Sequence, residues 1–244
     1  MEDEPTNELD ADEKPMGDPL LSDCLSDMAQ VYRDDPTKAV RGQAFIKPLH
    51  KYLGSALEKR LSPWAKRRGI KVVYEAKVLG SHKPKDVDVA LVDPENGPLM
   101  LIGVRSQMSS VGKNALNYYE GIVGECISLQ DRFPLATHGY LYLMPQRPIK
   151  EDRETEVIHH ERWARFYENI SGRSGPAYDK LRGIYDEFGY MVVDFDHEPP
   201  TLRDDLIAHT TDLDLRVGTF VNRMIATFND RMLFWDVFTE EEEA

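Results

Sequence analysis

The chain has 244 residues, of which 41% are hydrophobic and 30% are charged, and its formal net charge is −13. This length suits one substantial domain. No apolar run approaches the roughly 20 residues of a membrane helix, and the acidic start does not resemble a secretory signal, so we expect neither. Two cysteines, Cys24 and Cys126, argue against a disulfide framework and favour the reducing cytoplasm.

Charge is distributed unevenly along the chain. Acidic residues crowd the first 27 positions, and residues 240–244 form a second acidic tail. Between Arg41 and Lys85, by contrast, twelve Lys and Arg residues face only Glu58 and Glu75. Such a segment fits either an anionic polymer ligand or a solvated helix face.

The first half of the chain predicts a tail, a helix and three strands. Residues 1–20 lack periodicity and are rich in proline and acid, which predicts disorder. Apolar residues at helical spacing predict a helix over 42–68, interrupted by Pro63 near its end and stopped by Gly69. Alternation and β-branched residues predict a strand over 70–79, and apolar runs bounded by polar turns predict strands over 87–92 and 99–105.

The second half alternates between helices and strands. Ser109 or Ser110 is expected to cap a helix whose apolar face continues to Ile127. The apolar run 138–144 predicts a strand buried on both sides. The remaining predictions are a helix over 178–188, a strand over 190–195, a helix over 215–234, and an inserted helix or mobile loop within 151–175.

This order of elements predicts an α/β fold with a mixed central sheet flanked by helices. We expect a single domain over residues 21–239, with its core in 42–145 and a C-terminal elaboration in 146–239.

Acidic and basic residues at the second and third predicted strands suggest a metal-dependent site. Asp88 opens the second strand, and Gly103, Arg105 and Gln107 share one face of the third. Glu58, on the long helix, is expected to reach the same end of the sheet. Oxygen ligands of this kind hold a divalent cation, which activates water for attack on phosphate, while a cation such as Arg105 stabilises the developing charge.

The passage from Asp88 to Gly103-Val-Arg105 resembles the PD-(D/E)XK nuclease superfamily, and so does the order helix–strand–strand–strand–helix–strand. The resemblance implies a restriction-endonuclease-like core over roughly residues 42–144. It also implies that Asp88 binds metal and that Glu58 assists.

Two positions depart from the pattern of that family. Gly103 stands where the second carboxylate belongs and supplies no ligand, and Arg105 stands where lysine belongs. Arginine keeps a positive charge and bidentate phosphate geometry but cannot act as a base. Gln107 or Glu120 is expected to enter the metal shell instead, and Lys113 to replace the lysine.

Several alternatives stay open at the level of sequence. Asp86 competes with Asp88 for the metal, and Glu75 is either a third ligand or a solvent-facing partner of Lys77. The segment from Arg162 to Tyr167 interleaves cations and aromatic rings, which suits either base stacking or packing on the core. Contacts with nucleic acid are expected from a further group of residues: Ser109, Ser110, Lys113, Asn114, Lys83 and Lys85.

The sequence therefore predicts an endonuclease dependent on Mg²⁺ or Mn²⁺ that hydrolyses nucleic acid, with duplex DNA as the expected substrate. Restriction, phage defence or repair is the expected context, and a homodimer or a subunit of a defence complex the expected assembly. The alternative is a degenerate nuclease-fold domain that binds nucleic acid or acts as a scaffold.

Overall fold

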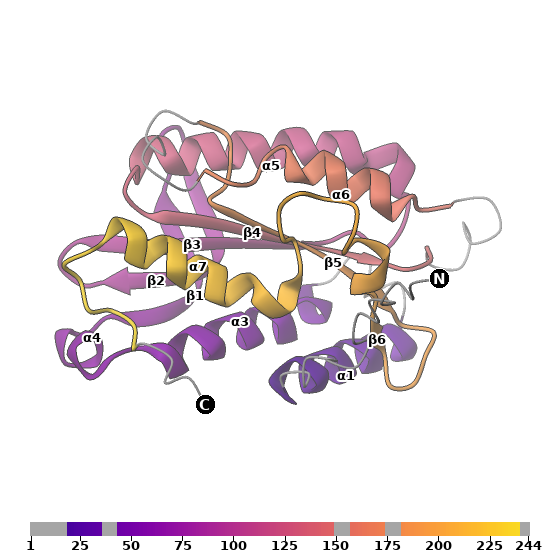
Figure 1. Ribbon diagram of the computed structural model, residues 1–244, viewed down its shortest axis with the longest axis horizontal. Helices are drawn as coiled ribbons and strands as arrows, with labels where there is room; N and C mark the ends of the chain where they lie inside the picture. Colours follow the sequence, from indigo (N-terminus) through magenta and orange to yellow (C-terminus); the bar gives the residue numbers. More distant parts are fainter. Residues whose placement is uncertain (1–18, 36–42, 149–156, 174–181, 240–244) are drawn as a thin grey trace, which may run out of the picture.

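The computed structural model describes residues 19–35, 43–148, 157–173 and 182–239. Within these ranges six strands form one sheet in the order β1-β2-β3-β4-β5-β6. The strands are β1 (Lys71–Leu79), β2 (Pro84–Asp93), β3 (Gly97–Ser106), β4 (Thr137–Pro145), β5 (Glu187–Asp194) and β6 (Thr201–Leu202). Strands β3, β4 and β5 are parallel, and the other neighbouring pairs are antiparallel. The predicted α/β fold with a mixed sheet flanked by helices is confirmed (Figure 1).

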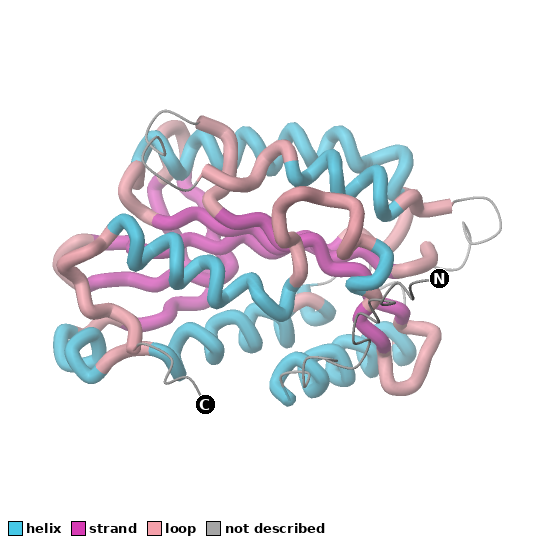
Figure 2. The backbone as a smooth tube through the Cα atoms, viewed as in Figure 1, coloured by secondary structure: helices cyan, strands magenta, loops and turns pink. Residues whose placement is uncertain are grey.

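Helices cover both faces of this sheet (Figure 2). They are α1 (Pro19–Asp34), α3 (Lys47–Arg60), α4 (Pro63–Arg68), α5 (Val111–Arg132), α6 (His160–Glu168) and α7 (Val217–Arg231), with short 3₁₀ turns η1 (Gln43–Phe45) and η4 (Asp204–Leu206). Helices α1, α3 and α7 share one hydrophobic core with one face of the sheet, and α5 and α6 pack on the other face. No helix in the described ranges combines the length and the apolar character of a membrane span.

The helix predicted over 42–68 is in fact three elements. A 3₁₀ turn precedes α3, and α3 ends at Arg60 because Leu61 is extended. Helix α4 then starts afresh at Pro63, where the Ser62 hydroxyl accepts a hydrogen bond from the Ala65 N–H at 3.0 Å. Gly69 ends α4 with a φ of 83°, a left-handed conformation that glycine adopts without strain.

Other boundaries also differ from the predictions. The helix predicted over 178–188 is wrong in its described part, since residues 182–186 are not helical and β5 already begins at Glu187. In this irregular segment the Tyr185 N–H donates to the Ile170 carbonyl and the Asp186 N–H to the His138 carbonyl, so its backbone bonds to distant residues instead of within a helix. Helix α1 was not predicted, whereas α6 confirms the helical alternative within 151–175. Residues 1–18, Arg41 and residues 240–244, with their predicted acidic tails, lie outside the described residues.

A buried ion pair ties the start of β5 to the rest of the chain. The side chain of Asp186 is fully buried and accepts hydrogen bonds from the His138 N–H at 2.7 Å and from Arg173 and Arg231. Burial by itself raises the pKa of Asp186, but the two guanidinium groups outweigh it and hold this pKa below its usual value. Asp186 is therefore charged in the folded protein and joins β4, β5 and α7.

Asp186→Asn should destabilise the protein by roughly 3–5 kcal/mol, because it leaves two buried arginines without their counter-charge. Urea unfolding at pH 7 measures this. Asp205→Asn, which breaks the exposed pair with Arg203, is the control and should cost at most about 1 kcal/mol.

Because the folded pKa is lowered, the stability from Asp186 is present above the ordinary pKa of 3.8 and is lost as the pH falls below it. A difference between wild type and variant that persisted at pH 2 would contradict this account.

Candidate metal centre

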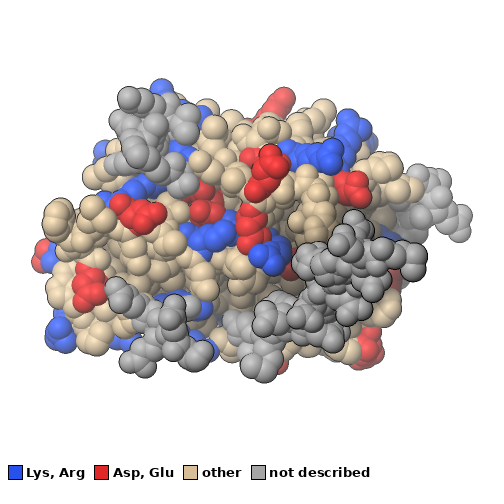
Figure 3. All heavy atoms as spheres, viewed as in Figure 1, with Lys and Arg blue, Asp and Glu red and all other residues tan. Residues whose placement is uncertain are grey.

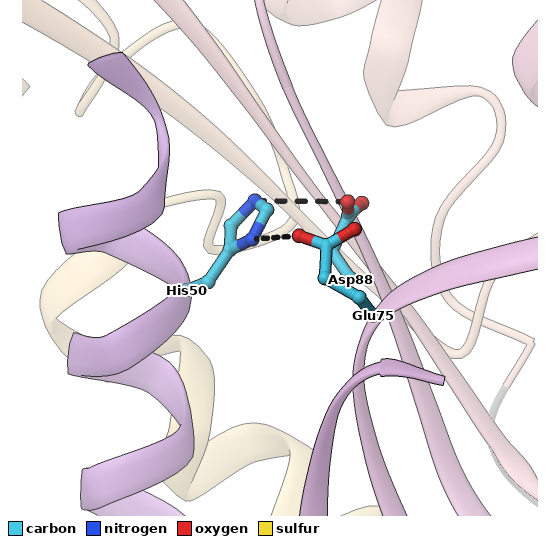
Figure 4. A group of neighbouring side chains, drawn as sticks. All are labelled: His50, Glu75 and Asp88. Carbon is cyan, nitrogen blue, oxygen red and sulfur yellow. Dashed lines mark hydrogen bonds and ion pairs between the residues drawn. The ribbon is translucent and has the colours of Figure 1, made fainter. Parts of the chain in front are cut away.

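Three side chains with metal-binding atoms meet between α3 and the first two strands (Figure 4). His50 comes from α3, Glu75 from β1 and Asp88 from β2, and one ligand atom of each lies within 4.8 Å of the others. His50 Nδ1 is 3.1 Å from Glu75 Oε1, and His50 Nε2 is 3.6 Å from Asp88 Oδ1. The imidazole is buried, with 4% of its side chain exposed, whereas Glu75 and Asp88 are 39% and 26% exposed. The cluster is thus open to solvent from the carboxylate side.

The two carboxylates meet because both strands reverse their side-chain alternation at the same place. In β2, Val89 and Leu91 face α3, so Val87 should as well, yet it packs on the opposite side. In β1, Val72 faces α3. Ala76 lies four residues later and should face the same way, but it packs on the opposite side. The pairs Tyr74–Val89 and Ala76–Val87 place Glu75 directly opposite Asp88, and Glu75 has a positive φ of 49°. The reversal therefore brings two acidic side chains together across one ladder position.

A close approach of α3 to β1 brings His50 to this point. Gly54, one turn after His50, lies against the Tyr74 ring, and a Cβ there would be 2.2 Å from the tyrosine oxygen. The absence of a side chain lets the helix pack tightly on the strand. His50 shares the buried face of α3 with Leu53 and Leu57, and its imidazole consequently points into the sheet.

The charge of Asp88 is poorly compensated by the protein itself. Burial, together with the neighbouring Glu75 and Glu125, raises the pKa of Asp88 to about 7. The Val104 N–H, which donates to Asp88 Oδ2 at 2.6 Å, acts in the opposite direction. Burial lowers the pKa of His50, which favours the neutral imidazole despite Glu75. Near neutral pH the cluster therefore has room for additional positive charge.

The residues fit a divalent cation. His50 Nε2 is buried and has no hydrogen-bond partner among the described residues. When Nδ1–H donates to Glu75, Nε2 presents its lone pair towards Asp88, as in metal sites where a carboxylate orients the histidine. Two ligand atoms on one cation lie roughly 3.0–3.4 Å apart, close to the 3.6 Å seen here. A mixed nitrogen and oxygen donor set suits Mn²⁺ better than Mg²⁺, which prefers oxygen alone.

A second group of charged residues lies on the α5 side of Asp88. A Cβ on Gly103 would be 2.6 Å from the Tyr140 ring and 3.4 Å from Glu125 Oε1. Position 103 thus has no room for a side chain, and the carboxylate of Glu125, from α5, lies close to the space that such a side chain would enter. Lys85 Nζ is 3.7 Å from Glu125 Oε2. Burial raises the pKa of Glu125, while Lys85 and Arg105 lower it.

The structure separates the metal ligands predicted from sequence. Asp88 is in the cluster, and Asp86, its competitor, is exposed. Glu58 and Glu120 are also exposed and lie outside the group of three ligands. Gln107 is buried and structural in its contacts: its amide faces the carbonyls of Ser110 and Val111, and its oxygen accepts from Tyr142.

The residues predicted to stabilise charge or to contact nucleic acid spread over a wider area. Arg105 is exposed, with its guanidinium 4.9 Å from the centre of the Tyr118 ring. Ser110 is the N-cap residue of α5 but has a φ of 50° and makes no capping bond with its hydroxyl. The remaining residues of this set are exposed or half-buried: Lys83, Lys113, Ser109 and Asn114. Lys85 is largely buried by its pairing with Glu125.

Sequence reasoning missed His50 and Glu125, and it left Glu75 undecided. The sequence did indicate His50, which lies three residues before Leu53 and seven before Leu57 and therefore shares the buried face of the same helix. No sequence pattern indicated the position of Glu75, because it is the positive φ of this residue that turns its side chain towards α3. Glu125 lies five residues, about one and a half turns, beyond Glu120 and therefore on a different face of α5, close to Gly103 of β3.

Comparison with known proteins gives no relative: no family model, curated protein or solved structure matches the chain. The function must therefore be argued from the site itself.

The cluster should bind Mn²⁺ more tightly as the pH rises from 6 to 8. With a pKa of about 7, Asp88 is mostly protonated at pH 6, and the affinity should increase by about tenfold over this interval. Saturating Mn²⁺, at about 100 times its Kd, should add about 2.7 kcal/mol of stability and raise the Tm by several degrees. Thermal unfolding and calorimetry measure both effects. Asp88→Asn should abolish them and Asp86→Asn should not, and equal responses of the two variants would exclude this site.

Gly103→Ala should destabilise the protein by about 1–3 kcal/mol, because the new methyl group meets the Tyr140 ring. Gly121→Ala is the matched control: it adds a methyl group to α5 in open space and should stabilise by up to about 1 kcal/mol. Urea unfolding compares the two. Equal effects would show that position 103 has space for a side chain.

Proposed function

We propose that this chain is a metal-dependent nuclease with a restriction-endonuclease-like core, acting on phosphodiester bonds of nucleic acid, with duplex DNA as the expected substrate. The observation that carries the proposal is the convergence of His50, Glu75 and Asp88 beside a backbone N–H of β3. The order α3-α4-β1-β2-β3-α5-β4 supports it, because apart from the short α4 it follows the helix–strand–strand–strand–helix–strand order of that family.

Each residue of the site would have its own role in this reaction. His50, Glu75 and Asp88 would hold the cation, which when bound supplies a Lewis acid for water and phosphate. Glu125, kept in place by Lys85, is the carboxylate best placed to accept a proton near Asp88, because burial raises its pKa. Arg105 presents an exposed guanidinium next to the same edge and would neutralise charge on the phosphate.

The test is cleavage of duplex and single-stranded DNA and RNA by purified protein with Mn²⁺ or Mg²⁺. We expect metal-dependent cleavage, faster with Mn²⁺, that falls about 100-fold or more in Asp88→Asn and His50→Ala. Glu125→Gln should also be impaired. Glu58→Gln and Glu120→Gln are matched controls and should retain activity.

Two outcomes would contradict the proposal. One is a lack of metal-dependent cleavage above the Asp88→Asn background on every substrate. The other is a loss of activity in Glu58→Gln or Glu120→Gln equal to that in Asp88→Asn, which would move the site away from the cluster.

A nucleic-acid-binding module without catalysis is the second candidate. The specific observation in its favour is Gly103, where the Tyr140 ring excludes any ligand from the third strand. In this case the protein would bind duplex DNA with an affinity that falls with salt, Asp88→Asn would bind equally well, and neither would cleave.

A further inference from the structure

A groove runs between α5 and α6 at the end of the sheet where β3, β4 and β5 finish. One cavity of about 490 Å³ is lined by Val111, Gly112 and Leu116 of α5 and by Arg162, Trp163 and Phe166 of α6. A second cavity, of about 540 Å³, lies at the start of α6 and shares His159 and Arg162 with the first. We call the two together the α6 groove. It is separate from the metal centre, to which it contributes no ligand.

Helix α6 divides its aromatic and charged residues between the core and this groove. Ala164 and Tyr167 are fully buried in the core. Trp163 and Phe166 are half-buried and line the groove, with their ring centres 5.6 Å apart and nearly perpendicular. The packing interpretation of this segment therefore accounts for Tyr167, but it leaves part of each of the other two rings facing solvent.

Positive charge accompanies the exposed rings. Arg162 and Arg165 are exposed, and Arg162 makes no ion pair or hydrogen bond within the described residues. Arg165 uses only its Nε, which donates to the Thr210 carbonyl at 3.1 Å. Glu161 is an acidic residue at the second cavity. Basic side chains gather at the upper right of Figure 3, where Figure 1 draws α5 and α6, although acidic groups lie beside them.

A chain of contacts joins the groove to the metal centre. Val104 donates to Asp88, and the next residue, Arg105, lies over the Tyr118 ring. The neighbouring Tyr119 packs on Phe166 of the groove, with ring centres 4.2 Å apart. From Tyr118 to Val111 the distance along α5 is about 10 Å. Arg105 therefore lies between the backbone group that contacts Asp88 and the helix that lines the groove.

We propose that the α6 groove binds an unpaired stretch of nucleic acid, with bases stacked against Trp163 and Phe166 and phosphates facing Arg162 and Arg165. Exposed aromatic rings interleaved with cations suit single strands, because every base has a face that stacks and every nucleotide carries a charge. This inference rests on the proposed function. It specifies the substrate as nucleic acid with a single-stranded segment, such as a duplex carrying an overhang, rather than a blunt duplex.

The test measures binding apart from cleavage. In the Asp88→Asn background without added metal, fluorescence anisotropy follows a labelled 12-nucleotide oligo(dT), oligo(U), and duplexes with and without a dT overhang. We expect Arg162→Glu to weaken oligo(dT) binding at least tenfold and Trp163→Ala to weaken it about 5- to 100-fold. Trp163→Phe should restore most of the affinity. Arg132→Glu, the same charge change at the exposed C-terminal end of α5, should alter it less than threefold.

Salt dependence gives a second measurement that altered folding alone would not change. Arg162→Ala should reduce the slope of log K against log salt by about 0.7 for a single strand. In addition, the duplex with an overhang should bind more tightly than the blunt duplex, and this preference should disappear in Trp163→Ala.

The inference is overturned if folded Arg162→Glu and Trp163→Ala both bind oligo(dT) within twofold of the parent. It is also overturned if a poly-Glu peptide competes for the groove as well as oligo(dT) does and Trp163→Ala leaves peptide binding unchanged, which would indicate an acidic protein partner. The proposed function fails separately: if the groove variants lose binding but the protein with Asp88 intact never cleaves, the groove stands and the nuclease does not.

Discussion

The site depends on two carboxylates that the sheet forces together. Glu75 and Asp88 face each other across the β1–β2 ladder because both strands reverse their alternation at that pair. The nearest polar groups reduce the resulting repulsion only in part, since burial favours a neutral His50 and a single backbone N–H reaches Asp88. Burial first, and then the neighbouring Glu75 and Glu125, raise the pKa of Asp88, so the site lacks compensating positive charge. A bound metal ion would supply this charge and would also use His50 Nε2, which has no hydrogen-bond partner among the described residues.

The packing of aromatic rings on the other face explains why the third strand lacks a carboxylate. Tyr140 packs with Tyr185 and Phe188 in a cluster that also covers β4 and β5. Its ring lies over position 103, where only glycine fits. The acidic side chain beside this position is Glu125, which comes from α5. The same packing arrangement thus places the Tyr140 ring over Gly103 and leaves the Glu125 carboxylate, from α5, beside it.

Much of the fold was predictable from sequence, while the site was predictable only in part. The alternation of Val87–Val92 and the apolar run 138–144 identified strands, and Asp88 was found because it precedes such a run. Glu58 was favoured on α3 because carboxylates are the expected ligands, yet the face of a helix that meets the sheet is set by packing, and His50 lies on it. Glu75 depends on one φ value. The helix predicted over 178–188 failed in its described part because Tyr185 and Asp186 donate their backbone N–H groups to distant carbonyls, which local spacing does not reveal.

The direction of the parallel strands explains why the groove and the metal centre lie at one end of the molecule. Strands β3, β4 and β5 point the same way, so the segments that follow them, which lead into α5 and towards α6, meet at their carboxyl ends. Asp88 reaches that end because β2 is antiparallel to β3 and begins there. Arg105, near the end of β3, is the residue that both regions share: its strand neighbour Val104 supports Asp88, and its guanidinium packs on the helix that leads to the groove. Within the fold, Arg105 therefore links the backbone group that supports Asp88 to the helix that lines the groove, so the proposed binding and the proposed chemistry would meet at this cation.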